Sequence, residues 1–150
     1  MSSKGRISRL SRLVAENQHR GLQSIHLPIY FGPRSPKKTR QKALASPIAH
    51  LLKHVSPTLR RVTIELRDLY HPTTITSTRL LKLHELDEVV VVDRFPKLEH
   101  LRLEVYATYG LCRDSYYWSK CADAGRRALP NLHARRQLVV WNITPWTYTF

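Results

Sequence analysis

The histidines are the first residues in this chain whose type and spacing could support chemistry. His50 and His54 lie four positions apart, so on a helix they would share one face and could both ligate zinc. No glutamate follows His50, as it would in the H-E-x-x-H motif, and no third ligand lies near the pair in the sequence. We therefore interpret them as partly exposed helix residues and expect neither a metal nor a cofactor.

The carboxylates and the potential nucleophiles form no catalytic pattern. Asp87 and Glu88 are adjacent, so on a helix their side chains diverge by about 100° and do not make a carboxylate pair. We expect them to solvate the helix and to pair with its neighbouring side chains. The sequence contains no G-x-S-x-G motif and no phosphate-binding glycine loop. Cys112 and Cys121 are the only cysteines, which predicts reduced thiols rather than a disulfide framework. The sequence thus predicts no enzyme and no catalytic residue.

Basic residues are concentrated in the first part of the chain. Residues 1–61 contain 13 Lys or Arg and one acidic residue, whereas residues 62–150 are nearly neutral; the net charge is +14. Such a segment attracts the phosphates of nucleic acid or lipid, or an acidic protein. Five candidate phosphate contacts lie in one proline-containing loop: Arg34, Lys37, Lys38, Arg40 and Lys42. Few aromatic residues accompany this loop and no DNA-binding motif is visible, so nucleic acid is possible but not favoured.

A recurring spacing of apolar residues indicates the architecture that would position these side chains. The pattern L-x-x-φ-x-φ-x-φ, in which φ is apolar, begins at Leu22, Leu59 and Leu98, and a degraded copy begins at Leu132. Its alternating positions predict four strands, over about 22–29, 59–66, 98–105 and 133–141. A repeat of this length is typical of a stacked array, in which no unit buries its apolar face alone.

Helical patterns separate the predicted strands. Apolar stripes predict crossover helices over about 46–55, 78–92 and 116–128, which would make the strands parallel. Pro28 cannot donate a ladder hydrogen bond and therefore predicts an edge position for the first strand. Residues 1–21 predict a basic amphipathic helix that caps the array. The same segment also resembles a mitochondrial transit peptide, so a mitochondrial location stays open beside a cytoplasmic or nuclear one.

Three phrases carry a resemblance to a known family. Residues 95–103 (FPKLEHLRL), 56–62 (SPTLRRV) and 129–132 (LPNL) resemble the strand entries of the leucine-rich-repeat-like region of fungal F-box proteins. The resemblance covers about residues 20–141 and implies a substrate-recognition surface for a protein partner. The repeats are longer than regular leucine-rich repeats, and no F-box precedes Leu22. A fragment, a decayed paralogue and a free-standing relative all fit this pattern.

The sequence therefore predicts an α/β fold, a short irregular leucine-rich-repeat-like solenoid with about four parallel strands and crossover helices. Its domains would be the cap helix (1–21), the repeat domain (22–141) and an aromatic tail (142–150). No apolar run approaches the length of a membrane span. We expect a non-enzymatic protein-interaction module of undetermined oligomeric state. The alternative is a nucleic-acid-binding or organelle-targeted protein that uses residues 1–61.

The residues between the apolar positions define the expected partner surface. In parallel register they stack across strands, which places Arg61 beside His100, Thr63 beside Arg102, and Glu65 beside Glu104. Neighbouring strands are only about 4.8 Å apart, so the two glutamates would form an unfavourable like-charge pair. Either Arg102 relieves the repulsion diagonally or a cationic group of the partner does. The expected partner surface thus comprises Arg61, Thr63, Glu65, His100, Arg102 and Glu104.

Overall fold

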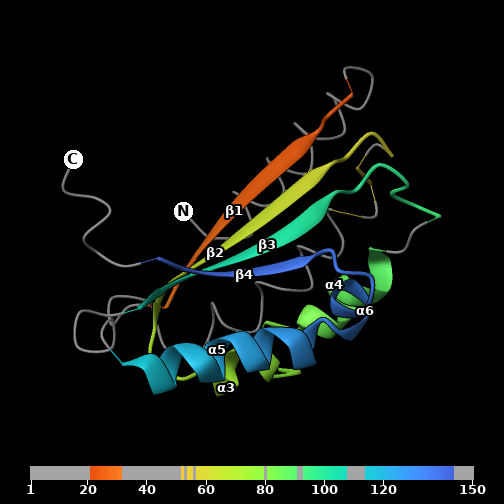
Figure 1. The fold of residues 1–150 in the computed structure, drawn as a ribbon. Helices are drawn as coiled ribbons and strands as arrows, with labels where there is room; N and C mark the ends of the chain where they lie inside the picture. Colours follow the sequence, from red (N-terminus) through yellow and green to blue (C-terminus); the bar gives the residue numbers. More distant parts are fainter. Residues whose placement is uncertain are drawn as a thin grey trace.

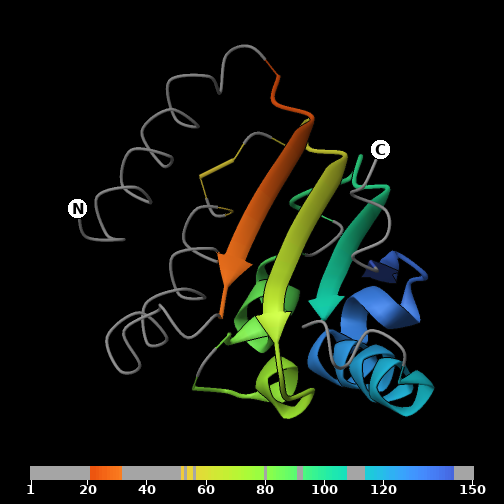
Figure 2. The same ribbon diagram turned by 90° about the vertical axis from the view of Figure 1, so that its left-hand side faces the viewer.

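A parallel sheet with helices on one of its faces forms the fold (Figure 1). The computed structural model describes residues 21–31, 52, 54–55, 57–79, 81–90, 93–107 and 114–143. Four strands follow one another in chain order across the sheet: β1 (Ser24–Tyr30), β2 (Arg61–Leu69), β3 (His100–Ala107) and β4 (Leu138–Ile143). All neighbours are parallel, and Figure 2 shows β1, β2 and β3 side by side with their arrows in one direction. The predicted α/β class with four parallel strands is confirmed.

The inner face of the sheet carries the core because alternate side chains of a strand point to the same side. Val62 of β2 pairs with Leu101 of β3, and both are fully buried. The alternation is interrupted near the end of β2, where Asp68 has a φ of 58° and the register shifts. This bulge turns the next residue, Leu69, into the core, where it is 1% exposed.

The first strand lies at an edge of the sheet, as Pro28 predicts. Among the described strands, β1 pairs only with β2. A proline is tolerated there because no second neighbour requires its missing N–H.

Four helices lie on the inner side of the sheet in the described part of the chain: α3 (Thr73–Thr76), α4 (Leu83–Val89), α5 (Ser115–Ala128) and α6 (Pro130–Ala134). The longest of them, α5, packs against α3 and β4, while α4 packs against α6. Asp114 caps α5, because its carboxylate accepts hydrogen bonds from the backbone N–H groups of Tyr116 and Tyr117. The helix predicted over 116–128 is confirmed.

The helix predicted over 78–92 is shorter than expected. It begins only at Leu83, because Lys82 has a left-handed backbone with a φ of 48°. It ends at Val89, before the β-branched Val90. The threonine-rich segment before it contains a separate short helix, α3.

The predicted start of the last strand, about residue 133, is wrong. Pro130 takes the first position of α6, where its missing N–H costs nothing. A left-handed residue, Arg136, then turns the chain, and β4 begins at Leu138. β4 continues to Ile143, two residues beyond the expected end of the repeat domain. Residues 1–20 of the predicted cap helix, most of the helix over 46–55, and residues 144–150 of the tail lie outside the described residues. Gly21, the last residue of the predicted cap, has a left-handed backbone with a φ of 70° and is not helical.

Candidate functional site

The outer face, as we call the sheet surface that points away from α3–α6, contains the expected partner surface. The expected register is confirmed: Arg61 pairs with His100, Thr63 with Arg102 and Glu65 with Glu104. These six side chains alternate with the core residues of β2 and β3, so they share the face that points away from α3–α6. The structure thus brings together the side chains that the sequence placed in rows.

Two carboxylates lie at the centre of the outer face. They are shielded from solvent, unlike the exposed side chains of an ordinary sheet surface. Glu65 is 5% exposed and Glu104 is 8% exposed, on directly paired strands. Burying two like charges side by side is strongly unfavourable unless other groups neutralise them and donate hydrogen bonds to them. The neighbours of the two glutamates therefore determine what this site can do.

A histidine and an arginine contact the two oxygens of Glu65. His26 of β1 places its Nε2 atom 2.7 Å from Oε2 of Glu65. On the other side of the carboxylate, the Nε–H of Arg67 donates a hydrogen bond to Oε1. The two oxygens of Glu65 thus have different partners, and only the one that faces β1 meets an exposed side chain.

Glu104 is held by side chains of its own strand. Nη1 of Arg102 lies 3.4 Å from its Oε1 atom, and the hydroxyl of Tyr106 donates to Oε2 at 3.2 Å. The contact of Arg102 is therefore with Glu104 along β3. Arg102 thus relieves the like-charge pair, as expected, but along its own strand rather than diagonally, and Arg67 of this chain is a second cation at the pair.

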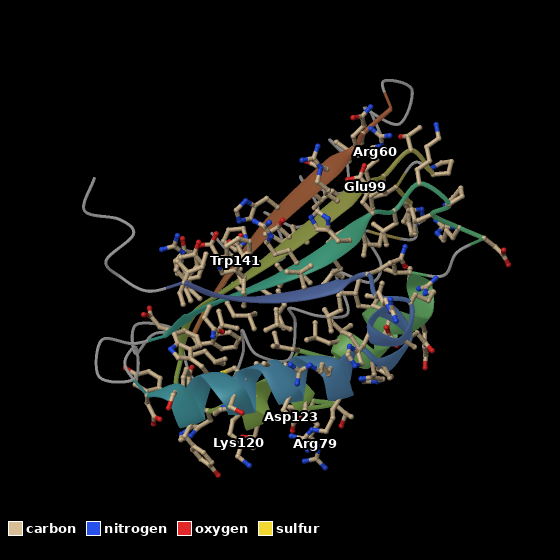
Figure 3. The ribbon with its side chains drawn as sticks, viewed as in Figure 1. Arg60, Arg79, Glu99, Lys120, Asp123 and Trp141 are labelled. Carbon is tan, nitrogen blue, oxygen red and sulfur yellow. The ribbon has the colours of Figure 1, made fainter. Side chains whose placement is uncertain are left out.

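Aromatic rings surround the cations of the outer face. The guanidinium of Arg67 lies 4.4 Å from the ring centroid of Tyr106 and 5.8 Å from that of Tyr30. The guanidinium of Arg102 lies 4.5 Å from the ring centroid of Trp141, on the neighbouring strand β4. Tyr30 is 58% exposed and Trp141 is 49% exposed. Figure 3 shows Trp141 on the outer side of the sheet, whereas Lys120 and Asp123 project from the helical layer on the opposite side.

Sequence reasoning missed part of this arrangement. It did not include Trp141 in the expected partner surface, although this residue lies within β4 and pairs with Glu104. It also did not include His26, which pairs with Thr63, one row away from Glu65. The strand register could have indicated the contact between His26 and Glu65, because a side chain as long as histidine reaches a diagonal neighbour in the next row.

Other candidate residues from the sequence lie elsewhere. All five candidate phosphate contacts, from Arg34 to Lys42, and His50 lie outside the described residues. Asp87 was expected to solvate a helix, but it is 2% exposed. Its carboxylate accepts hydrogen bonds from the backbone N–H groups of Asn131 and Leu132, at 2.9 and 3.0 Å. Asp87 also lines a cavity of about 250 Å³ between the helices, but its carboxylate is already used to cap α6.

The described cysteine is a core residue. Cys121 lies on α5, is fully buried, and forms no disulfide. Burial raises the pKa of its thiol to about 11, and burial also raises the pKa of the neighbouring Tyr117. A thiol that stays protonated at neutral pH is a poor nucleophile and a poor metal ligand. Cys121 therefore contributes packing rather than chemistry.

Comparison with known proteins identifies no relative of this chain. No model of a protein family matches it, and neither the curated proteins nor the solved structures contain a match. Within the described residues, every helix is too short or too polar to cross a membrane.

Proposed function

We propose that this protein is a non-enzymatic interaction module that binds another protein on the outer face of its sheet. The observation that carries the proposal is the half-exposed Trp141, whose ring lies against the guanidinium of Arg102. Tryptophan, tyrosine and arginine are enriched in the residues that dominate binding energy, because they combine large apolar area with hydrogen-bond donors. Here they lie together on one exposed face.

The buried carboxylates would prepare this face for binding. Glu65 holds Arg67, and Glu104 holds Arg102, in positions next to the aromatic rings. Side chains that are already ordered lose less conformational entropy when a partner binds. The network therefore favours recognition of a protein surface with acidic and apolar groups.

We further infer that the strands belong to a short, irregular leucine-rich-repeat-like solenoid, similar to the recognition repeats of F-box proteins. The sequential order of parallel strands and the placement of the described helices on one side support this inference. In such an array the helices supply the core while the sheet face stays available to a partner. The alternative function, nucleic-acid binding or organelle targeting by residues 1–61, rests on their 13 basic residues.

Affinity capture with matched variants tests the protein-binding proposal. Full-length protein would be used to capture partners from its native cells, with nuclease treatment and quantitative mass spectrometry. Trp141→Ala and Arg102→Glu alter the outer face. Lys120→Glu makes the same charge reversal on the exposed surface of α5, on the opposite side of the molecule (Figure 3).

We expect the parent and Lys120→Glu to capture the same specific protein. The two outer-face variants should capture at least tenfold less of it, and nuclease treatment should not reduce the amount captured by the parent. Circular dichroism would verify that each variant is folded. Equal capture by all variants would contradict recognition at the outer face. Loss of every captured protein after nuclease treatment would instead favour the nucleic-acid alternative.

A further inference from the structure

Three potential metal ligands converge on the outer face from three adjacent strands. They are the imidazole of His26 on β1, the carboxylate of Glu65 on β2 and the carboxylate of Glu104 on β3. One ligand atom of each lies within 4.8 Å of the ligand atoms of the other two. We propose that these side chains form a binding site for a first-row divalent metal ion of the zinc type.

The ligand set suits this class of ion. Imidazole together with carboxylate is a common donor set for zinc and its neighbours, whereas calcium requires six to eight oxygen ligands. Ligands about 2.0–2.1 Å from a tetrahedral ion lie roughly 3.3 Å apart. The present 2.7 Å between Nε2 of His26 and Oε2 of Glu65 is thus slightly shorter than a bridged pair requires. The His26 side chain is 58% exposed, so it has room to make this small adjustment.

The surrounding hydrogen bonds fix the carboxylates in the way that outer partners of metal ligands do. Arg67 contacts Oε1 of Glu65 and leaves Oε2 turned toward His26. Tyr106 and Arg102 hold Glu104 from its own strand. Partners of this kind orient ligating carboxylates, and their removal commonly weakens metal binding by about 10- to 100-fold. Arg67 and Arg102 already pair with the two carboxylates, so charge balance alone does not require the imidazole of His26 beside Glu65.

The burial of the ligands separates this site from an ordinary acidic surface. The side chains of Glu65 and Glu104 are 6% and 11% exposed, while that of His26 is 58% exposed. Three protein ligands leave one position of a tetrahedral ion for water or for a donor atom of a bound molecule. The inference stands independently of the proposed protein partner, because it uses only the ligands within this chain.

Titration of the full-length protein with Zn²⁺ by calorimetry, and with Co²⁺ by visible absorption, tests the site. The ligand variants are His26→Ala, Glu65→Gln and Glu104→Gln. Glu99→Gln is the matched control, because Glu99 is an exposed glutamate that pairs with Arg60 at the far end of the strands from Trp141 (Figure 3). The double variant His50→Ala/His54→Ala removes the other pair of histidines with zinc-compatible spacing.

We expect the parent, Glu99→Gln and the double histidine variant to share a site with micromolar or tighter affinity for Zn²⁺. Each ligand variant should bind Zn²⁺ at least tenfold more weakly at this site. Zn²⁺ should raise the melting temperature of the parent but not of the ligand variants. His26→Ala keeps the test decisive if a glutamine variant does not fold, because His26 is exposed on an edge strand. Equal binding by His26→Ala and the parent, or binding lost only in the double histidine variant, would overturn the proposal and leave an ion-pair network.

Discussion

Gly125 lies where helix α5 comes closest to strand β4. A Cβ atom at this position would lie 2.8 Å from Cγ2 of Val140 and 3.4 Å from Cδ2 of Leu103. Valine is stiff at χ1, so it cannot rotate away easily. Gly125→Ala should therefore destabilise the protein by about 1–3 kcal/mol through overpacking, although alanine is the better helix former by about 1 kcal/mol.

Urea unfolding of Gly125→Ala, of Val140→Ala and of the double variant tests this prediction as a double-mutant cycle. Removing the valine methyl groups should relieve the clash, so the double variant should lose less stability than the sum of the single variants. Additive losses, or a stabilising Gly125→Ala, would show that the helix and the strand are not in close contact there.

At the same scale, the contacts of single residues show why the candidate site was only partly predictable. The apolar alternation determined the pairing of Glu65 with Glu104, because a shift by one residue would expose every core side chain. The partners of these carboxylates depend on rotamers, which the spacing does not determine. His26 could as well have pointed to solvent, and its approach to Glu65 became visible only in the structure.

Among the elements, helix α6 depends on a cap that comes from a distant part of the chain. Asp87 of α4 is buried and accepts hydrogen bonds from two N–H groups at the start of α6. Asp87→Ala would remove the partner of both donors and leave the N–H of Leu132 unpaired in the interior, so we expect a loss of about 2–4 kcal/mol from the missing cap and the unsatisfied group. Urea unfolding measures the loss.

Asp114 provides the matched control for Asp87, because it caps α5 in the same way but at the surface. Water can replace its carboxylate, and Asp114→Ala should therefore cost only about 0.5–2 kcal/mol. Equal losses in the two variants would contradict the burial argument. The distant cap also explains why sequence patterns predicted α5 but not α6: the signal for α5 is local, whereas that for α6 lies 44 residues upstream of Asn131.

Across the whole molecule, the basic segment and the aromatic outer face belong to different parts of the chain. The described strands and helices hold a nearly neutral fold with an aromatic and charged outer face, while most of the excess positive charge belongs to residues 1–61. Protein recognition by the outer face should depend on a few close contacts between surfaces of complementary shape. Binding of phosphate by the basic segment should depend on ionic strength. The salt dependence of binding can therefore distinguish the two functions.

Fluorescence anisotropy can measure the affinity of the protein for a DNA duplex at several salt concentrations. This measurement tests whether the basic loop or the outer face contacts phosphate. Each phosphate contact contributes about 0.9 to the slope of log K against log salt, so Lys37→Gln/Lys38→Gln/Arg40→Gln should reduce the slope by roughly 2–3. Arg102→Gln, which removes one charge from the outer face, should leave it unchanged. Equal slopes in parent and triple variant would show that the loop does not contact phosphate. A slope reduced only by Arg102→Gln would place nucleic acid on the sheet and contradict the proposed division between basic segment and outer face.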